Sequence, residues 1–240
     1  MTRNKCVIAA GGLGTRLQGF RQNNKTKILL EVNGMAMINK QITQIKKWGI
    51  EEFIIITSPD YDLMIKEVTK KEFPNLKIDY VVQDKPLGIA HALSKAEQYI
   101  DNDDTVVFVL GDNFFEENLI KDIDLNNFRD EGGCIIFTSK VKNPNEFGVA
   151  SVDELGNVMH IEEKPAEPKS NLAVVGLYIF DSFAMDNIKK LSPSSRGEYE
   201  ITDLINIYID EKKCTNVEFG GWWVDAGTPD RIIELENLLA

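Results

Sequence analysis

The amino-acid sequence predicts an α/β fold: a Rossmann-like single domain with a mostly parallel central sheet flanked by helices, and an inserted antiparallel lobe. Three observations lead to this prediction. Apolar, strand-like runs alternate with amphipathic helical stretches through the first half of the chain. The second half has the pattern of antiparallel hairpins instead. No linker-like stretch separates the halves, so we expect one domain over residues 1–240.

The first half alternates two kinds of segment. Most strands are predicted where apolar residues, many of them β-branched, run without interruption, as in a sheet covered on both faces. Helices are predicted where apolar residues recur every three or four positions. The predicted order is strand 6–10, helix 37–48, strand 53–57, helix 61–71, strand 78–82, helix 89–100 and strand 105–110.

The second half is predicted to be richer in short strands. Residues 153–157, Asp-Glu-Leu-Gly-Asn, form a hairpin turn between two alternating runs. Thr228 is suited to cap a last helix over residues 229–240, with Pro229 at its first position. The predicted order is strand 134–141, hairpin strands 148–152 and 158–163, strand 174–180, helices near 183–190 and 200–210, and short strands 217–219 and 222–224.

Composition excludes several classes of partner. The chain has 240 residues, 43% of them hydrophobic, and a formal net charge of -11. That charge repels nucleic acid and anionic lipid, so we expect no nucleic-acid or membrane partner. We find no signal-peptide pattern and no apolar run of membrane-spanning length. Three widely spaced cysteines without a Cys-x-x-Cys pair argue against zinc and favour a cytoplasmic location.

The strongest local signal is the glycine-rich segment 11–16, Gly-Gly-Leu-Gly-Thr-Arg, which directly follows the first predicted strand. Glycines there let backbone N–H groups turn toward an anion. The spacing is neither that of a P-loop nor that of the dinucleotide fingerprint. An ordinary tight turn is the alternative, but a basic residue inside the segment, Arg16, and a second one downstream, Lys27, favour phosphate binding.

Two aspartates follow strand-like runs. Asp112 comes after Thr-Val-Val-Phe-Val-Leu-Gly, and Asp225 comes after Trp-Trp-Val. Ligands of open α/β sheets bind outside the carboxyl ends of the strands. Each aspartate alone is more often a turn former than a metal ligand. As a pair, they predict one Mg²⁺ site, because Mg²⁺ takes one or two carboxylates together with substrate phosphate oxygens.

Other polar positions allow two interpretations. Gln83, followed by Pro-Leu-Gly at 86–88, either presents an amide to a nucleobase edge or belongs to a plain loop. Glu163 and Lys164 end a predicted strand, where they bind a sugar and a phosphate or simply form a charged strand end. His91 and His160 have no visible triad partners, and we expect both to be structural.

Nine segments, in order along nearly the whole chain, together resemble the sugar nucleotidylyltransferases, and most closely the glucose-1-phosphate thymidylyltransferases. A single segment of this kind is weak evidence, whereas nine in order are highly specific. The segments are AAGGLGTRL, KILLEV, VVQDKPLGIAHAL, VLGDNFF, FGVASVD, IEEKPAEPKSN, VVGLYIFD, RGEYEITD and WWVDAGT.

The resemblance implies a reaction, its partners and a role for each matching residue. It implies dTTP and a sugar 1-phosphate as substrates, Mg²⁺ as cofactor and a homo-oligomer. Residues 1–130 would mainly bind the nucleotide, and residues 131–228 would mainly bind the sugar phosphate. On the nucleotide side, the resemblance implies Gly11, Gly12, Gly14 and Thr15 around the triphosphate, Arg16 and Lys27 in catalysis, and Gln83 and Gly88 at the base. It implies that Asp112 and Asp225 bind Mg²⁺, with Asp112 also beside the nucleotide. On the sugar side, it implies Gly148, Glu163 and Gly176 along the sugar, and Lys164 and Arg196 on its phosphate.

The sequence departs from the family pattern beside the sugar segments. Phe147 stands where Tyr is common, and Val175 stands where Thr is common, so the identity of the sugar stays open. UTP or CTP with a different phosphorylated acceptor is an alternative on the same fold. A non-catalytic sensor of nucleotide sugars is a further alternative, although Arg16, Lys27 and both aspartates are present. Longer members add C-terminal helices that help build a regulatory nucleotide site, and we expect one nucleotide site per chain here.

Overall fold

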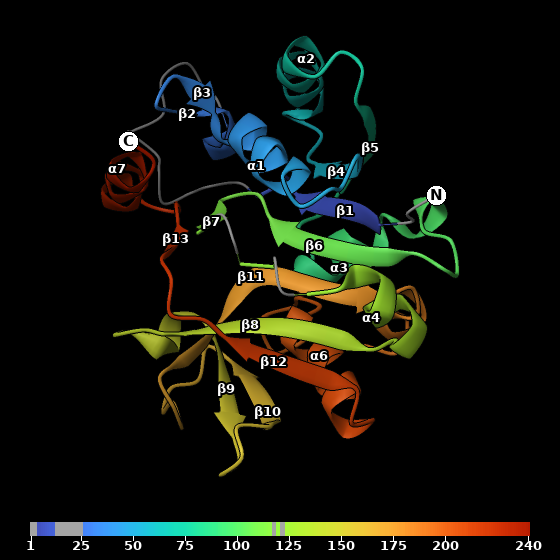
Figure 1. The fold of residues 1–240 in the computed structure, drawn as a ribbon, viewed down its shortest axis with the longest axis vertical. Coiled ribbons are helices and arrows are strands. Elements are labelled where there is room, and N and C mark those ends of the chain that lie inside the picture. The colour runs from blue at the N-terminus through green and yellow to red at the C-terminus, as the bar shows by residue number, and fades with distance from the viewer. Residues whose placement is uncertain (1–3, 13–25, 117–118, 121–122) are drawn as a thin grey trace.

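The computed structural model describes residues 4–12, 26–116, 119–120 and 123–240 (Figure 1). These residues form a nine-stranded sheet in the order β10-β9-β11-β6-β1-β4-β5, with β8 paired to β11 and β12 paired to β8. The strands of this sheet are β1 (Asn4–Ala9), β4 (Glu52–Thr57), β5 (Lys77–Val82), β6 (Thr105–Leu110), β8 (Cys134–Lys140), β9 (Gly148–Val152), β10 (Val158–Glu163), β11 (Leu172–Asp181) and β12 (Cys214–Glu218). Two small ladders pair β2 (Glu31–Val32) with β3 (Met35–Ala36) and β7 (Asn113–Phe115) with β13 (Trp223–Asp225).

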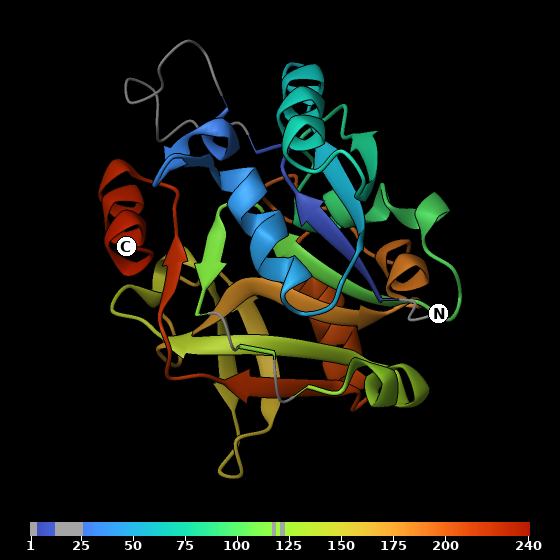
Figure 2. The same ribbon diagram turned by 45° about the horizontal axis from the view of Figure 1, so that its top comes forward.

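Helices cover both faces of the sheet (Figures 1 and 2). One buried cluster joins the sheet to α1 (Met37–Lys46), α2 (Asp62–Glu72) and α4 (Leu125–Glu131). A second cluster joins the opposite face to α3 (Ile89–Ser94), α5 (Ala184–Ile188) and α6 (Ile201–Asp210). The last helix, α7 (Pro229–Leu238), packs on a small third cluster beside β13. This arrangement confirms the predicted α/β fold with helices on both sides of the sheet.

The strands β6, β1, β4 and β5 form the parallel part of the sheet. Their side chains alternate between the two buried clusters: Cys6 and Ile8 of β1 face one cluster, and Val7 faces the other. A strand covered on both faces needs apolar residues at every position. The unbroken apolar runs in the sequence therefore predicted β1, β4 and β6 correctly, whereas β5 at the edge of the sheet is less buried and carries Asp79.

The antiparallel part is built around the long strand β11. This strand pairs with β6 over Leu177–Asp181 and with β9 at Ala173, while β8 follows its other edge. The hairpin of β9 and β10 continues the sheet beyond β11. The neighbour of β11 thus changes between Ala173 and Leu177, and this change leaves Gly176 outside both ladders.

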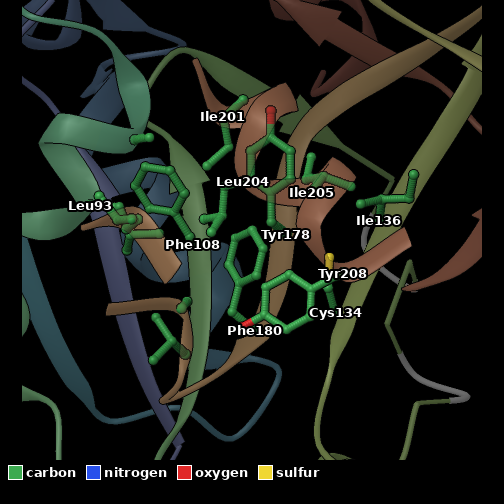
Figure 3. Close-up of a cluster of buried hydrophobic side chains, with 14 of the residues drawn as sticks. Leu93, Phe108, Cys134, Ile136, Tyr178, Phe180, Ile201, Leu204, Ile205 and Tyr208 are labelled. Carbon is green, nitrogen blue, oxygen red and sulfur yellow. The ribbon is translucent and has the colours of Figure 1, made fainter. Parts of the chain in front are cut away.

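Aromatic side chains fill the core between β11 and α6 (Figure 3). The rings of Phe108 and Tyr178 lie 5.8 Å apart, those of Tyr178 and Phe180 5.9 Å, and those of Phe180 and Tyr208 5.9 Å. These spacings are typical of packed aromatic pairs. The chain of rings joins β6, β11 and α6, so it fixes the antiparallel part against the parallel part.

Several elements differ from the sequence predictions. The helix predicted over 89–100 ends at Ser94 and is followed by a 3-10 turn, Glu97–Tyr99. The strand predicted at 217–219 begins earlier, at Cys214, because it pairs with β8 along its whole length. Thr228 occupies the N-cap position of α7, but its side chain makes no capping hydrogen bond. The strand predicted at 222–224 corresponds to β13. The ladder β2–β3, strand β7 and helix α4 were not predicted, because these elements are too short to show a periodic pattern.

Across the part of the chain that the structure describes, none of the helices has both the length and the apolar character that crossing a membrane requires.

Candidate active site

A cavity of about 280 Å³ opens at the carboxyl ends of β1, β5 and β6. Ligand sites of open α/β sheets are expected there. The predicted nucleotide-site residues that the structure describes all line this cavity: Gly11, Gly12, Lys27, Gln83, Gly88 and Asp112. Apart from Glu198, the rest of the wall is apolar and includes Pro86 and Ile89. Gly14, Thr15 and Arg16 lie outside the described residues.

A second cavity, of about 170 Å³, adjoins the first. Ile89 and Leu110 line both cavities and form the wall between them. Four of the predicted sugar-site residues line the second cavity, together with the predicted metal ligand Asp225: Gly148, Glu163, Lys164 and Gly176. The structure therefore brings two predicted groups of residues into neighbouring hollows. Arg196 is the exception, because it lines neither cavity.

The ladder of β7 and β13 brings the backbone segments of the two aspartates side by side. Asp225 lies opposite Asn113, the residue that follows Asp112. The backbone N–H of Ala226 donates a hydrogen bond of 2.8 Å to the carbonyl oxygen of Asp112. Because Asp112 lines the first cavity and Asp225 lines the second, the pair spans the boundary between them.

Lys27 forms an ion pair with Asp112, and each side chain is 15% exposed. Burial acts to raise the pKa of Asp112, but the charge and hydrogen bond of Lys27 outweigh it, helped by a hydrogen bond from Asn113. The net effect is a pKa below the ordinary value of an aspartate. Asp112 is therefore an anion at neutral pH, with an ammonium group beside it.

The residues at the boundary fit a magnesium ion. Among the described residues, no three His, Cys, Asp or Glu side chains gather into a closed metal cage. Mg²⁺ does not need such a cage, since it keeps water and substrate phosphate oxygens among its ligands. The ionised Asp112 and the neighbouring Asp225 supply hard oxygen donors of the required kind.

Asn113 links both aspartates to the sheet. Its buried amide nitrogen donates to Oδ1 of Asp112 at 3.0 Å. Its oxygen accepts hydrogen bonds from the backbone N–H of Gly176 at 3.2 Å and from the indole N–H of Trp223 at 2.8 Å. Gly176 is the position at which β11 changes neighbours, so the Asn113 side chain satisfies an N–H that no ladder uses.

A cluster of charged side chains lies at and beside the second cavity. Glu163 Oε1 lies 3.7 Å from Lys164 Nζ and 3.7 Å from an Arg196 nitrogen. Arg196 also pairs with Glu198 at 2.7 Å and with Glu200 at 3.2 Å. Burial raises the pKa of Glu163 above its ordinary value, and the charge of Glu200 adds to this effect, while Lys164 and Arg196 oppose it. The predicted phosphate ligand Arg196 is thus held by carboxylates beside the cavity.

Two glycines keep the second cavity open. A Cβ at Gly148 would lie 2.7 Å from Cγ2 of Thr202, and one at Gly176 would lie 2.6 Å from Oδ1 of Asn113.

Lys164 follows β10 with a φ of 45°, a conformation that is unusual for a residue with a side chain. Thr202 lines the cavity, and its buried hydroxyl has no hydrogen-bond partner among the described residues.

Gln83 and Gly88 line the first cavity together with several apolar side chains. The backbone N–H of Gln83 donates to the carbonyl of Thr57 at 2.8 Å, which fixes the segment to the end of β4. Gly88 has a φ of 104°, and a Cβ there would lie 2.5 Å from the carbonyl oxygen of Tyr199. A glycine is therefore needed for the segment before α3 to pack against Tyr199.

Sequence reasoning missed five residues. Asn113 and Trp223 stand in conspicuous segments, VLGDNFF and WWVDAGT, but they received no role. Glu198 lines the first cavity, Thr202 lines the second, and the ring of His91 contacts the Gln83 amide. Their adjacency to assigned residues was the one signal available.

Of the two departures beside the sugar segments, Phe147 lines the second cavity, whereas Val175 lies in the core on the opposite face.

Comparison with known proteins agrees with this geometry. A glucose-1-phosphate thymidylyltransferase of Neisseria meningitidis is 36% identical over an alignment of 239 residues, with 98% of this chain and 82% of that protein covered. The nucleotidyltransferase Agl11 of low-salt glycan biosynthesis in Haloferax volcanii is 34% identical over 245 residues, with 98% of this chain and 66% of that protein covered.

Solved structures agree with the fold. A Bacillus anthracis protein described as a glucose-1-phosphate thymidylyltransferase, crystallised with sucrose, superposes with a TM-score of 0.87 at 36% identity, covering 99% of this chain and 95% of that chain. A UDP-glucose pyrophosphorylase with bound UDP-glucose shares the fold, with a TM-score of 0.83 at 23% identity, covering 100% of this chain and 98% of that chain.

The sequence pattern of the nucleotidyl transferases matches residues 5–240. The chain therefore belongs to the nucleotidyl transferase family, as an enzyme of the glucose-1-phosphate thymidylyltransferase type.

Proposed function

We propose that the chain transfers a thymidylyl group from dTTP to glucose 1-phosphate and forms dTDP-glucose and pyrophosphate. The observation that carries this proposal is the placement of the two aspartates. Asp112 lines one cavity and Asp225 lines the next. The two cavities are adjacent, because Ile89 and Leu110 line both of them. Two substrates in adjacent hollows would meet beside these carboxylates.

The reaction is an in-line displacement at the α-phosphorus. A phosphate oxygen of glucose 1-phosphate forms the new P–O bond, and the bond between the α-phosphorus and the bridging oxygen breaks. The bonding electrons leave with pyrophosphate. Because the nucleophile is already an anion, the reaction needs no general base. Positioning and charge neutralisation are then the main sources of catalysis.

Each group of residues has a task in this reaction. Gly11 and Gly12 would leave room for the triphosphate, and Lys27 would turn from Asp112 to a phosphate oxygen. Asp112 and Asp225 would hold Mg²⁺, which supplies charge neutralisation and Lewis-acid polarisation when bound. Arg16 and the remaining glycine-rich segment belong to this proposal from the sequence, since they lie outside the described residues.

The sugar phosphate would occupy the second cavity. Gly148 and Gly176 would leave space for the sugar, and Glu163 would accept hydrogen bonds from its hydroxyl groups. Lys164 would bind the phosphate, joined by Arg196 if the phosphate displaces Glu198 from it. We accordingly propose that residues 1–130 mainly bind the nucleotide and residues 131–228 mainly bind the sugar phosphate. Glu198 is an exception, because it comes from the second part and lines the first cavity.

UTP is the second candidate nucleotide. The side-chain oxygen of Gln83 would accept a hydrogen bond from N3–H of uracil as well as from thymine, so this contact does not separate the two bases. Phosphorus NMR of the chain with glucose 1-phosphate, Mg²⁺ and either nucleotide tests the proposal. We expect the nucleotide sugar and pyrophosphate to appear in equal amounts, faster with dTTP. Unchanged spectra with both nucleotides would contradict the proposed function.

Oligomeric state and location are also proposals. Ile233 and Leu238 of α7 are 51% and 40% exposed, and a second copy of the chain in a homo-oligomer would cover them. Light scattering at several concentrations would measure the assembly. Three free cysteines suit the reducing cytoplasm.

A further inference from the structure

The amide nitrogen of Gln83 has two partners within the protein. Its Nε2 donates a hydrogen bond of 3.2 Å to the carbonyl oxygen of Gly88 and lies 2.8 Å from Nδ1 of His91. A carbonyl oxygen only accepts hydrogen bonds, so the atom facing Gly88 must be the amide nitrogen. The contact with Gly88 therefore fixes the orientation of the amide.

The same contact determines the state of His91. The amide nitrogen has two hydrogens, and the first is used by Gly88. Its second hydrogen points to Nδ1 of His91, which must then be the unprotonated ring nitrogen. His91 is thus a neutral ring with its proton on Nε2. Burial and the charge of Lys95 lower the pKa of His91, which favours this neutral form.

Both hydrogens of the Gln83 amide are now used by the protein. The group has only its oxygen, Oε1, left to offer to the cavity that Gln83 lines, and the described residues make no hydrogen bond to this oxygen. Thymine and uracil carry a hydrogen on N3, which such an oxygen accepts. Cytosine has a lone pair on N3, which would face the lone pairs of Oε1.

We infer that His91 is a positioning residue that fixes the Gln83 amide and so makes the site select nucleotides whose base carries a hydrogen on N3 against cytosine nucleotides. The inference rests on the proposed function, because it places the base at Gln83. Without His91, one of the two contacts that hold the amide is lost. The amide could then present a hydrogen to cytosine more easily.

Calorimetry without sugar phosphate tests the inference, since no turnover occurs. The measured quantity is the ratio of the Kd for dCTP to the Kd for dTTP, both with Mg²⁺. His91→Leu removes the acceptor at similar size, and His91→Asn keeps an acceptor near the place of Nδ1. His160→Leu, at an exposed histidine on β10, is the matched control.

We expect wild type to bind dTTP at least about tenfold more tightly than dCTP. The ratio should fall about fivefold in His91→Leu, roughly the value of one net hydrogen bond. His91→Asn and His160→Leu should stay within about twofold of wild type. An unchanged ratio in His91→Leu, with both affinities lowered equally, would assign His91 a merely structural role and overturn the inference. Equal wild-type affinities for the two nucleotides would also overturn it.

A spectrum of the wild-type protein gives a test that does not depend on variant folding. Nitrogen-15 NMR separates protonated from unprotonated ring nitrogens, and the spectrum of His160→Leu identifies the His91 signals by elimination. At pH 7 we expect a protonated Nε2 and an unprotonated Nδ1, and a protonated Nδ1 would overturn the inference. A wild-type chain that binds neither nucleotide would instead refute the proposed function and, with it, this inference.

Discussion

The side-chain nitrogen of Asn113 donates a hydrogen bond to Oδ1 of Asp112 at 3.0 Å, while the Asn113 oxygen receives the indole N–H of Trp223 at 2.8 Å. One buried amide thus connects a carboxylate of the first cavity with a side chain that lines the second. The same oxygen accepts the N–H of Gly176, so Asn113 also holds β11 in place.

Asn113→Ala should therefore destabilise the fold and weaken the site together. The substitution leaves the N–H of Gly176 buried without a partner, and we expect a loss of roughly 2–4 kcal/mol in the free energy of unfolding. Urea denaturation measures this loss. Trp223→Phe, which removes a single donor, should cost only about 1 kcal/mol. Equal stability of Asn113→Ala and wild type would show that the amide network contributes nothing.

Lys27→Met should reverse the pH dependence that Asp112 gives to stability. In wild type the pKa of Asp112 is lowered. Its contribution to the free energy of unfolding is therefore present above the ordinary aspartate pKa and is lost as pH falls through the lowered value. Without Lys27, burial dominates and raises this pKa. Asp112 then destabilises the protein as pH rises through the raised value.

Melting temperatures between pH 4 and pH 8 measure this change, with Lys85→Met as the control at an exposed lysine. The melting temperature of Lys27→Met should fall further below that of wild type as pH rises. The corresponding loss in the free energy of unfolding should reach roughly 2–4 kcal/mol at pH 7. Millimolar Mg²⁺ should stabilise Lys27→Met more than wild type, because no ammonium competes for Asp112. A difference that does not depend on pH would contradict the role assigned to the ion pair.

Gly148→Ala should damage the sugar site selectively. The new methyl group would meet Cγ2 of Thr202 at 2.7 Å and approach Glu163 at 3.4 Å. We expect the KM for glucose 1-phosphate to rise at least about tenfold, with little change in the affinity for dTTP. Thr202→Ser removes the obstructing methyl group, so the double variant should recover most of the loss. Failure of this rescue, or equal loss of dTTP affinity, would place the steric limit elsewhere.

Glu163→Gln should separate stability from activity. The pKa of Glu163 is raised by burial, so its charged form is disfavoured in the folded state. The contribution of Glu163 to the free energy of unfolding is fully present below its pKa in the unfolded chain. It is lost as pH rises through its pKa in the folded protein. The melting temperature of Glu163→Gln should therefore exceed that of wild type by a margin that grows from pH 4 to pH 8. The variant should nevertheless bind the sugar phosphate less tightly. A difference in melting temperature that narrows with rising pH would contradict this account.

The sequence predicted those elements that repeat a pattern over several residues. The strands β1, β4 and β6 are unbroken apolar runs because both faces of the parallel sheet are covered. The pair of β7 and β13 was beyond such reasoning, since its three-residue strands are separated by more than a hundred residues. Their ladder places Asp225 opposite Asn113, so the sequence predicted both aspartates without showing how they meet.

The site was predictable residue by residue, but its connections were not. Gln83 and Gly88 attracted attention as an amide and a glycine in one segment. The role of His91 depends on the side-chain direction of Gln83, which no sequence pattern specifies. Arg196 shows the opposite limit, because a basic residue that suits a phosphate is paired here with Glu198 and Glu200. The predicted roles of these residues stay predictions until ligands are measured.

The most direct test of the central claim is pyrophosphate release from dTTP and glucose 1-phosphate, measured for wild type, Asp112→Asn and Asp225→Asn over a range of Mg²⁺ concentrations. Both aspartates lie at the rim of the sheet, so the variants should fold, and melting curves check this. We expect wild type to release pyrophosphate in proportion to nucleotide sugar, and EDTA to abolish the release. Each variant should be slower by at least about a hundredfold. Near-normal turnover of either folded variant at limiting Mg²⁺, or no release by wild type with any nucleoside triphosphate and sugar phosphate, would contradict the account.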